Sequence, residues 1–259
     1  MSAYFETAVE VEFVDPADTR LYPDPGGLSP ECLKRFIAID IETGPLPEAE
    51  LRASLPPFDE SEVKVGNLKD PDKIAAKIAE AKAAHEREYF DRAALRAETG
   101  RVVAIGVGCD VNAPFIAGVG EDSLPSEVSL LEWWWETFVN YADEGRQFVG
   151  FNLFGFDIPF LLRRSWLHGI DVPRAVFAPG GRYLNDRCFI DLYQIWQAGS
   201  RQDSISLDRL SKFLGVGEKN GNGADFHKLW ESDRAAARAY LANDLAMTMR
   251  CASRLLNFY

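Results

Sequence analysis

The sequence has few of the residues that cross-link a chain or hold a soft metal. Its 259 residues include three scattered histidines and four cysteines that form no Cys-x-x-Cys pair: Cys32, Cys109, Cys188 and Cys251. This spacing argues against a disulfide framework and against a structural zinc site. We therefore expect reduced thiols in a cytoplasmic protein.

Long apolar runs and an excess of basic charge are also missing. No stretch of about 18 apolar residues exists, so no membrane span is expected, and residues 1–10 show no secretory signal. The net charge of −12 argues against a protein that coats nucleic acid nonspecifically. Residues 1–150, however, carry 29 acidic and 14 basic side chains, whereas residues 151–259 carry 11 and 14. The acidic balance therefore belongs to the first part of the chain.

The pattern of the chain predicts an α/β fold. Alternating or β-branched apolar segments predict strands at 35–41, 101–108, 114–118 and 147–151. Helical periodicity predicts helices at 71–99, 127–141, 158–167, 190–197, 207–214 and 232–256. Strands that cluster first and then alternate with helices indicate a mixed sheet flanked by helices.

Two segments fall outside this pattern. Residues 1–34 are rich in Pro, Gly and Asp, which predicts an irregular N-terminal arm and leaves residues 35–259 as one domain. Residues 45–100 begin with several prolines and continue into an Ala-, Lys- and Glu-rich helix with a charged outer face. We interpret this stretch as a helical insertion after the first strand.

The first acidic motif lies at the end of the first predicted strand. Asp40 and Glu42 are two residues apart, and residues i and i+2 of a strand point to the same face. Two carboxylates that close repel each other unless a proton or a cation lies between them, and hard divalent cations prefer carboxylate oxygens. The motif is therefore a candidate metal site, with a strand that simply ends in a polar loop as the alternative.

Two further acids occupy positions suited to an active site. Asp157 follows the strand at 147–151 and starts the next predicted helix, where a helix-capping aspartate is the alternative. Tyr240 and Asp244 lie four residues apart on the last predicted helix and therefore share a face. The alternative there is an amphipathic helix with one Tyr in the core and one Asp in solvent.

In this order, the segments D-I-E-T, N-L-F-G-F-D and Y-L-A-N-D resemble the three motifs of the DnaQ-like 3′–5′ exonucleases of the RNase H-like fold. The Tyr-x-x-x-Asp spacing is that of the tyrosine (DEDDy) subtype; the histidine subtype would need His where this chain has Ala239. Residues 189–196 and 206–230 also resemble predicted stand-alone exonucleases related to the proofreading domain of family B DNA polymerases. The resemblance covers about residues 35–257 and implies a mixed five-stranded sheet flanked by helices.

The resemblance further implies metal-dependent hydrolysis of phosphodiester bonds by a two-metal-ion mechanism. Two divalent ions, Mg²⁺ or Mn²⁺, would be held by four carboxylates: Asp40, Glu42, Asp157 and Asp244. Asp40 would bridge both ions, Glu42 and Asp244 would complete the site of the ion that activates water, and Asp157 would hold the second. Tyr240 would orient the attacking water as a neutral phenol.

The expected substrate is the 3′ end of a single-stranded nucleic acid, DNA rather than RNA. Such strands are usually bound by aromatic stacking and a basic groove. The expected contacts are Thr43, Asn152, Phe156 and Lys219, with a core position as the alternative for Phe156. Further candidate phosphate contacts are Arg163, Arg164, Arg182, Arg187 and Arg201.

The sequence also leaves alternatives of other classes. A catalytically weak nuclease-like domain could bind nucleic acid or serve as a polymerase-associated proofreading subunit, and a DNA polymerase or a repair complex is a candidate partner. A glycoside hydrolase with a carboxylate pair is a second alternative, but it explains neither Tyr240 nor the order of the motifs.

Overall fold

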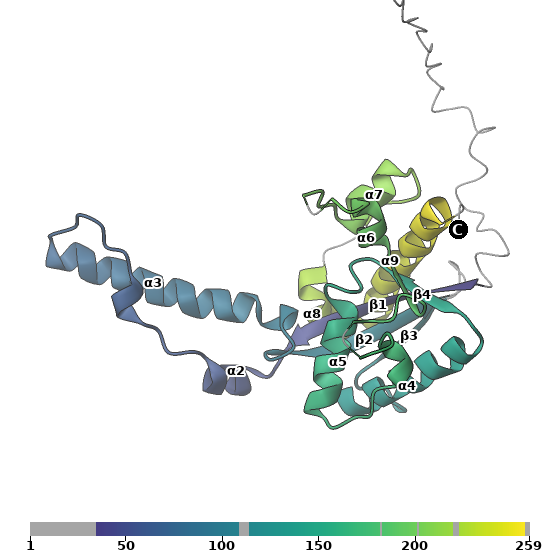
Figure 1. Cartoon of the computed structure of the whole chain (residues 1–259). Helices are drawn as coiled ribbons and strands as arrows, with labels where there is room; N and C mark the ends of the chain where they lie inside the picture. Colours follow the sequence, from purple (N-terminus) through teal and green to yellow (C-terminus); the bar gives the residue numbers. More distant parts are fainter. Residues whose placement is uncertain (1–34, 109–113, 182, 201, 220–222, 257–259) are drawn as a thin grey trace, which may run out of the picture.

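A computed structural model describes residues 35–108, 114–181, 183–200, 202–219 and 223–256. The predicted N-terminal arm lies outside these residues. The described chain forms a five-stranded sheet with helices on both faces (Figure 1), and the strand order is β3-β2-β1-β4-β5. The strands are β1 Phe36–Pro45, β2 Gly100–Gly108, β3 Phe115–Gly118, β4 Gln147–Gly150 and β5 Phe189–Asp191.

The sheet is mixed, with β1 at its centre. β1 pairs antiparallel with β2 and parallel with β4, while β2 and β3 are antiparallel and β4 and β5 parallel. The predicted mixed α/β fold is therefore confirmed. Because β1 and β4 run in the same direction, the first acidic motif, in the second half of β1, and the second motif, which follows β4, lie toward the same edge of the sheet.

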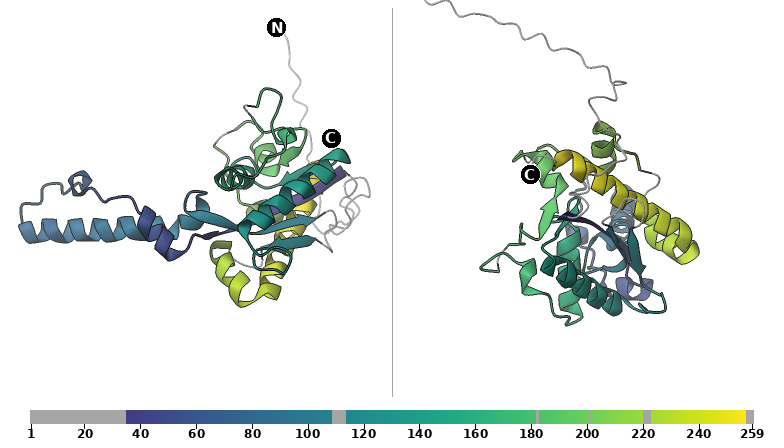
Figure 2. Two further views of the ribbon diagram at one scale, coloured as in Figure 1. Left: turned by 90° about the horizontal axis from the view of Figure 1, so that it is seen from below. Right: turned by 90° about the vertical axis from the view of Figure 1, so that its right-hand side faces the viewer.

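Two helical layers cover the sheet, one on each face (Figure 2). One layer is α4 Glu127–Asp143 and α5 Asp157–Leu167. The other is α6 Leu192–Gln197, α7 Leu207–Phe213, α8 Phe226–Ser232 and α9 Arg234–Leu255. Along β1, Ile37 and Ile39 pack in the core with α4 and α5, whereas Phe36 and Ala38 pack in the core with α9.

Several element boundaries differ from the sequence prediction. The helix predicted at 71–99 ends at Asp91 and is followed by the short 3₁₀ turn η2 Ala93–Leu95. The helix predicted at 190–197 is wrong at its start, because residues 189–191 pair with β4 as strand β5. That strand is defined by a pairing distant in sequence, which local periodicity does not report. Two helices, α2 Glu48–Ser54 and α8, were not predicted.

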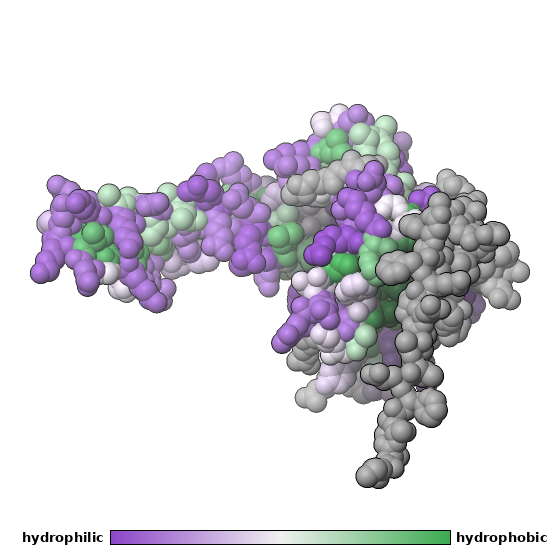
Figure 3. Space-filling model, turned by 90° about the horizontal axis from the view of Figure 1, so that it is seen from above, coloured by the Kyte–Doolittle hydropathy of each residue, from purple (hydrophilic) through white to green (hydrophobic). Residues whose placement is uncertain are grey.

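The insertion, residues 46–92, projects from the sheet (Figures 1 and 2). It consists of α2, the short 3₁₀ turn η1 Glu60–Glu62 and the long helix α3 Pro71–Asp91. None of the residues of α3 is buried, and the insertion presents a mostly hydrophilic surface (Figure 3). At about 1.5 Å per residue, α3 is roughly 30 Å long, so the turn before α3 lies that far from the end of the helix that joins the sheet. In that turn Gly66 has φ +61°, and no atom lies within 4 Å of a Cβ placed on it.

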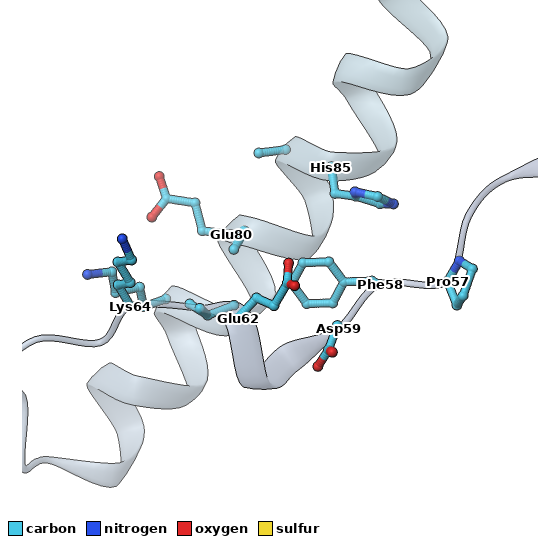
Figure 4. Close-up of a pocket in the computed structure, with 11 residues that line it drawn as sticks. Pro57, Phe58, Asp59, Glu62, Lys64, Glu80 and His85 are labelled. Atoms are coloured by element: carbon cyan, nitrogen blue, oxygen red, sulfur yellow. The ribbon is translucent and has the colours of Figure 1, made fainter.

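A cavity of about 680 Å³ lies within the insertion, between the segment after α2 and helix α3 (Figure 4). Phe58 approaches the ring of His85 at a centroid distance of 5.6 Å. His85 Nε2 also lies 3.1 Å from the Pro56 carbonyl oxygen. These contacts hold the extended segment against α3.

Among all the described residues, no helix has the length and apolar character needed to cross a membrane.

Candidate active site

A second cavity, of about 350 Å³, opens where the ends of β1 and β4 meet α9. All five predicted catalytic residues line it: Asp40, Glu42, Asp157, Tyr240 and Asp244. The four predicted nucleic-acid contacts also line it: Thr43, Asn152, Phe156 and Lys219. The fold therefore brings three distant segments of the chain to one place.

The alternation of β1 explains how its two acids reach this cavity. Phe36 and Ala38 pack toward α9, and the strand period of two continues that face to Asp40 and Glu42. The register with β2 then shifts between Glu42 and Thr43, which is a β-bulge. Beyond it, the Thr43 hydroxyl donates a 2.7 Å hydrogen bond to the Ala94 carbonyl oxygen. Thr43 thus ties the end of β1 to the base of the insertion.

Helix α9 supplies the third motif. The Asp233 carboxylate accepts a hydrogen bond from the Ala236 N–H and caps the helix. Tyr240 and Asp244 follow one turn apart, and both are buried. The close approach of α9 to the sheet depends on Gly106, where a Cβ would lie 2.6 Å from a Leu245 methyl carbon. The alternative reading, with Asp244 in solvent, is excluded because its side chain is buried.

Asp157 joins α5 directly to β1. Helix α5 begins at Asp157, and its capping position is occupied by Phe156, which provides no side-chain cap. Asp157 Oδ1 instead accepts a 3.1 Å hydrogen bond from the Ile41 N–H, between the two acids of the first motif. The side chain is buried. Its carboxylate is therefore held against the end of β1 by a contact that spans distant parts of the chain.

The loop before α5 is held by a carboxylate that was not predicted. Asp191, at the end of β5, accepts hydrogen bonds from the N–H groups of Asn152 (2.8 Å) and Phe154 (3.0 Å). Asn152 adopts φ +63°, in the left-handed region. A Cβ on Gly155 would lie 2.2 Å from Asn152 Oδ1, so the glycine makes room for this amide. The loop geometry presents Asn152 and Phe156 to the cavity.

The carboxylates of the cavity are crowded. One oxygen from each of Asp40, Glu42 and Asp244 can be chosen so that all three lie within 4.8 Å of one another. Burial and the neighbouring Asp244 raise the pKa of Asp40 to about 8. Burial, followed by the charge of Asp40, raises the pKa of both Glu42 and Asp157 well above the ordinary range. Burial also raises the pKa of Asp244.

Lys219 provides a positive charge in this cluster. Its Nζ lies 2.9 Å from Asp244 Oδ2 and 5.0 Å from the centre of the Tyr240 ring. Burial alone would lower the pKa of this ammonium, but Tyr240 and Asp244 raise it overall, so Lys219 is charged. Among the described residues that line the cavity, one ammonium faces four crowded carboxylates, and the raised pKa values show that the cluster takes up protons unless a further cation shares its charge.

The site has the properties of a divalent-metal centre. Its donors are carboxylate oxygens, which hard cations prefer. Within the described part of the chain, the buried Asp244 Oδ1 and the Tyr240 hydroxyl have no hydrogen-bond partner. A buried polar atom without a partner is costly, and a bound cation or its water would satisfy it. The residues present therefore fit one or two divalent ions.

The other candidate phosphate contacts are distributed over the molecule. Arg164 is buried and pairs with both oxygens of Glu127, so its prediction as a phosphate contact is wrong. Arg187 lies at the opposite edge of the sheet, where its carbonyl oxygen accepts a hydrogen bond from Gln147, the first residue of β4. Arg182 and Arg201 lie outside the described residues. Arg163 is exposed on α5.

Gly223 also lines the cavity and was not predicted. A Cβ there would lie 3.1 Å from the Tyr240 hydroxyl oxygen and 3.7 Å from Glu42 Oε2. Its only signal in the sequence is its place in the Gly-rich stretch 221–223 between the second and third motifs. Asp191 had a similar weak signal, an acid that ends a short apolar segment before a helix.

Comparison with known proteins agrees with this geometry. Residues 93–251, more than half of the chain, match a family described as predicted 3′–5′ exonuclease related to the exonuclease domain of PolB. A solved family B DNA polymerase from the hyperthermophilic archaeon Pyrobaculum calidifontis is similar with a TM-score of 0.52 and 18% sequence identity. That similarity covers 86% of this chain and 25% of the polymerase, and it shows the RNase H-like fold. No curated protein matches the chain.

Proposed function

The chain belongs to the predicted 3′–5′ exonucleases related to the exonuclease domain of PolB, and on that premise we propose that it removes nucleotides from the 3′ end of single-stranded DNA. The observation that carries the proposal is the meeting of three acidic motifs in one cavity. The family match begins at residue 93, so Asp40 and Glu42 lie outside it. Their position beside Asp157 and Asp244 supports the same activity independently of the match.

We assign the four carboxylates to two divalent ions, Mg²⁺ or Mn²⁺. Asp40, Glu42 and Asp244 form the closest group and would hold the ion that activates water. Asp157 would hold the second ion together with Asp40, whose charge acts on it directly. Such ions supply a nucleophilic water at neutral pH and neutralise the charge that develops on the leaving oxygen.

Tyr240 acts as a neutral hydrogen-bonding group in this proposal. Burial, followed by the carboxylates around it, raises the pKa of its phenol above the ordinary value of about 10. The phenol is therefore protonated at neutral pH and is unsuited to act as a base. Its hydroxyl is buried and without a partner among the described residues, so it is available to orient the attacking water. This assignment corresponds to the DEDDy subtype.

We propose that the substrate strand is bound by residues on the rim of the same cavity. Asn152 would hydrogen-bond the substrate strand. Phe156, whose ring centroid lies 5.5 Å from that of Phe160, would stack on the terminal base. Lys219 would contact the scissile phosphate once a cation shares the charge of Asp244. Thr43 would contribute mainly through its backbone, because its hydroxyl is bonded to Ala94.

The decisive experiment incubates the purified protein with 5′-labelled single-stranded DNA and Mg²⁺ or Mn²⁺. We expect a ladder of products shortened from the 3′ end, and EDTA should abolish it because the carboxylates cannot bind the attacking water without a cation. The same oligonucleotide as RNA measures the preference for DNA. Absence of shortened products with either metal on either substrate would rule out the enzyme and leave a nucleic-acid-binding role.

A further inference from the structure

We propose that Arg96 and Arg163 bind backbone phosphates of the strand as it leaves the catalytic cavity. Both line a third cavity, of about 610 Å³, at the base of the insertion. Leu95 lines this cavity and also the catalytic one, so the two adjoin. The inference rests on the proposed exonuclease function and extends it to a second binding site.

The two arginines differ from others near them in having no partner among the residues that the structure describes. Neither guanidinium forms a hydrogen bond or an ion pair within the described part of the chain. By contrast, Arg52 pairs with Glu48 and Glu86, and Arg92 pairs with Glu88. Two free guanidiniums in one cavity form a site for an anion with two or more charged groups, and phosphate suits their donor geometry.

The protein around both arginines fixes the positions of their backbones. Arg163 lies six residues after Asp157 on α5, about 9 Å along the helix axis from the catalytic cavity. The neighbouring Arg164 donates to the Ala97 carbonyl oxygen (3.0 Å) and to Glu127, which joins α5 to the segment after η2. The Arg96 carbonyl oxygen in turn accepts a 2.7 Å hydrogen bond from the Gly100 N–H, at the start of β2. The backbone that carries both guanidiniums is therefore held in place, and the exposed side chains can turn toward a phosphate.

The surface between the two cavities suits a single strand. Leu95 is 58% exposed at their junction, and an exposed apolar side chain there can pack against a base. Among the described residues that line the third cavity, one acid, Glu98, accompanies the two arginines, and Tyr89 provides an aromatic wall. The chain as a whole is acidic, so this local positive charge is a specific feature of the path from the active site.

The binding test uses a 5′-fluorescein-labelled oligothymidylate of about 12 nucleotides, a length within the range that single-strand-binding sites cover, in EDTA so that no cleavage occurs. We expect the double variant Arg96→Ala/Arg163→Ala to bind about tenfold more weakly in fluorescence anisotropy. Loss of two phosphate contacts should also reduce the slope of log Kd against log salt by about 1.4. Arg187→Ala, which removes one arginine charge at the opposite edge of the sheet, is the control, and each single variant, Arg96→Ala and Arg163→Ala, is compared with it at equal charge. Arg96→Lys/Arg163→Lys should recover part of the affinity, whereas misfolded protein would not.

The activity test separates this inference from the proposed function. The p-nitrophenyl ester of thymidine 5′-phosphate is a small substrate, so it should occupy the catalytic cavity without reaching the third cavity. We expect the double variant to hydrolyse it within about twofold of wild type, while its KM for the long strand rises. If wild-type protein hydrolyses neither substrate, the proposed function fails. If wild-type protein is active but the double variant binds and cleaves the long strand as wild type does, or no worse than Arg187→Ala, the second site is wrong.

Discussion

The pKa values of carboxyl groups are shifted in opposite directions at the catalytic edge of the sheet and in the insertion. At the edge, burial and Asp244 raise the pKa of Asp40 to about 8. In the insertion, hydrogen bonds from Ser61 lower the pKa of the exposed Asp59. The edge therefore holds an acid where its charge is disfavoured, while the insertion places its acid where the charge is solvated and satisfied.

The difference reflects how each region is held together. The edge is fixed by contacts between distant residues, such as Asp157 with Ile41, and tolerates crowded carboxylates because packing enforces their positions. The insertion is held by exposed contacts within itself, such as the ion pairs of Arg52 with Glu48 and Glu86 and of Arg92 with Glu88. Function that needs unfavourable electrostatics belongs in the first region, and four matched pairs of measurements test that division.

The largest effect is expected from Asp40→Asn compared with Asp59→Asn. Asp40→Asn should lower kcat on single-stranded DNA by about 10³-fold or more, because it removes the carboxylate that we assign to both divalent ions. At neutral pH it should also raise the midpoint of thermal unfolding in EDTA, because folding no longer requires this carboxyl to take up a proton or to carry a disfavoured charge. Asp59→Asn should leave kcat unchanged. An active Asp40→Asn variant would show that the site is assigned incorrectly.

The next pair is Tyr240→Phe and Tyr89→Phe. Tyr240→Phe should lower kcat by about tenfold with metal affinity nearly unchanged, since we assign its hydroxyl to orienting water and not to holding the cation. Its unfolding midpoint should not fall, because the lost hydroxyl has no partner in the described structure. Tyr89→Phe removes a hydroxyl that lies 2.8 Å from Ser54 Oγ in the insertion, and kcat on the p-nitrophenyl ester should stay constant. Equal losses in both variants would contradict a catalytic role for Tyr240.

The pH dependence of stability should distinguish the two regions. The native pKa of Asp40, about 8, exceeds the unfolded value of 3.8, so between these values the native state binds more protons. Stability in EDTA should therefore decrease as pH rises from about 4 to about 8, by at most about 1.4 kcal/mol per pH unit for one carboxyl.

The measurement is the free energy of unfolding of wild type minus that of Asp40→Asn across this range, which cancels most other groups. The lowered pKa of Asp59 has the opposite sign, so its stabilising contribution is present above the unfolded pKa and is lost as pH falls. Saturating Mg²⁺ should flatten the Asp40 trend, because cation binding stabilises the ionised native form. A difference curve that is flat in EDTA would contradict the raised pKa.

The smallest effect is expected from two helix substitutions. Ala252→Gly on α9 replaces a fully buried residue and should lower the global free energy of unfolding by about 2 kcal/mol, from helix propensity and lost burial together. Ala79→Gly on α3 should cost about 1 kcal/mol of local helix stability without changing the global value. Hydrogen exchange, read separately for α3 and the sheet, makes the comparison. A global loss from Ala79→Gly would mean that the insertion unfolds together with the sheet.

The sequence predicted the parts of the site whose residues are close along the chain. The two-residue spacing of Asp40 and Glu42 and the four-residue spacing of Tyr240 and Asp244 follow from strand and helix geometry. The structure places all four in one cavity. Their assignment to metal and water remains a prediction, and it depends on the resemblance of the three motifs in order.

What the sequence did not predict depends on contacts between distant residues. The strand β5 exists because it pairs with β4, and Asp191 at its end fixes the loop of Asn152. Arg164 is a basic residue of the type that binds phosphate, but it forms a buried ion pair with Glu127, which lies 37 residues away in the sequence. No local pattern distinguishes it from its neighbour Arg163, which is exposed.

The turn at Gly66 is a suitable site for attaching a tag to the molecule. It lies at the outer end of α3, and no atom lies within 4 Å of a Cβ placed there. Exposed loop tips of this kind are the positions that most readily accept inserted peptides. A biotin-acceptor tag placed after Gly66 would anchor single molecules to a surface with the catalytic cavity unobstructed, so that successive cleavage steps on one strand could be timed.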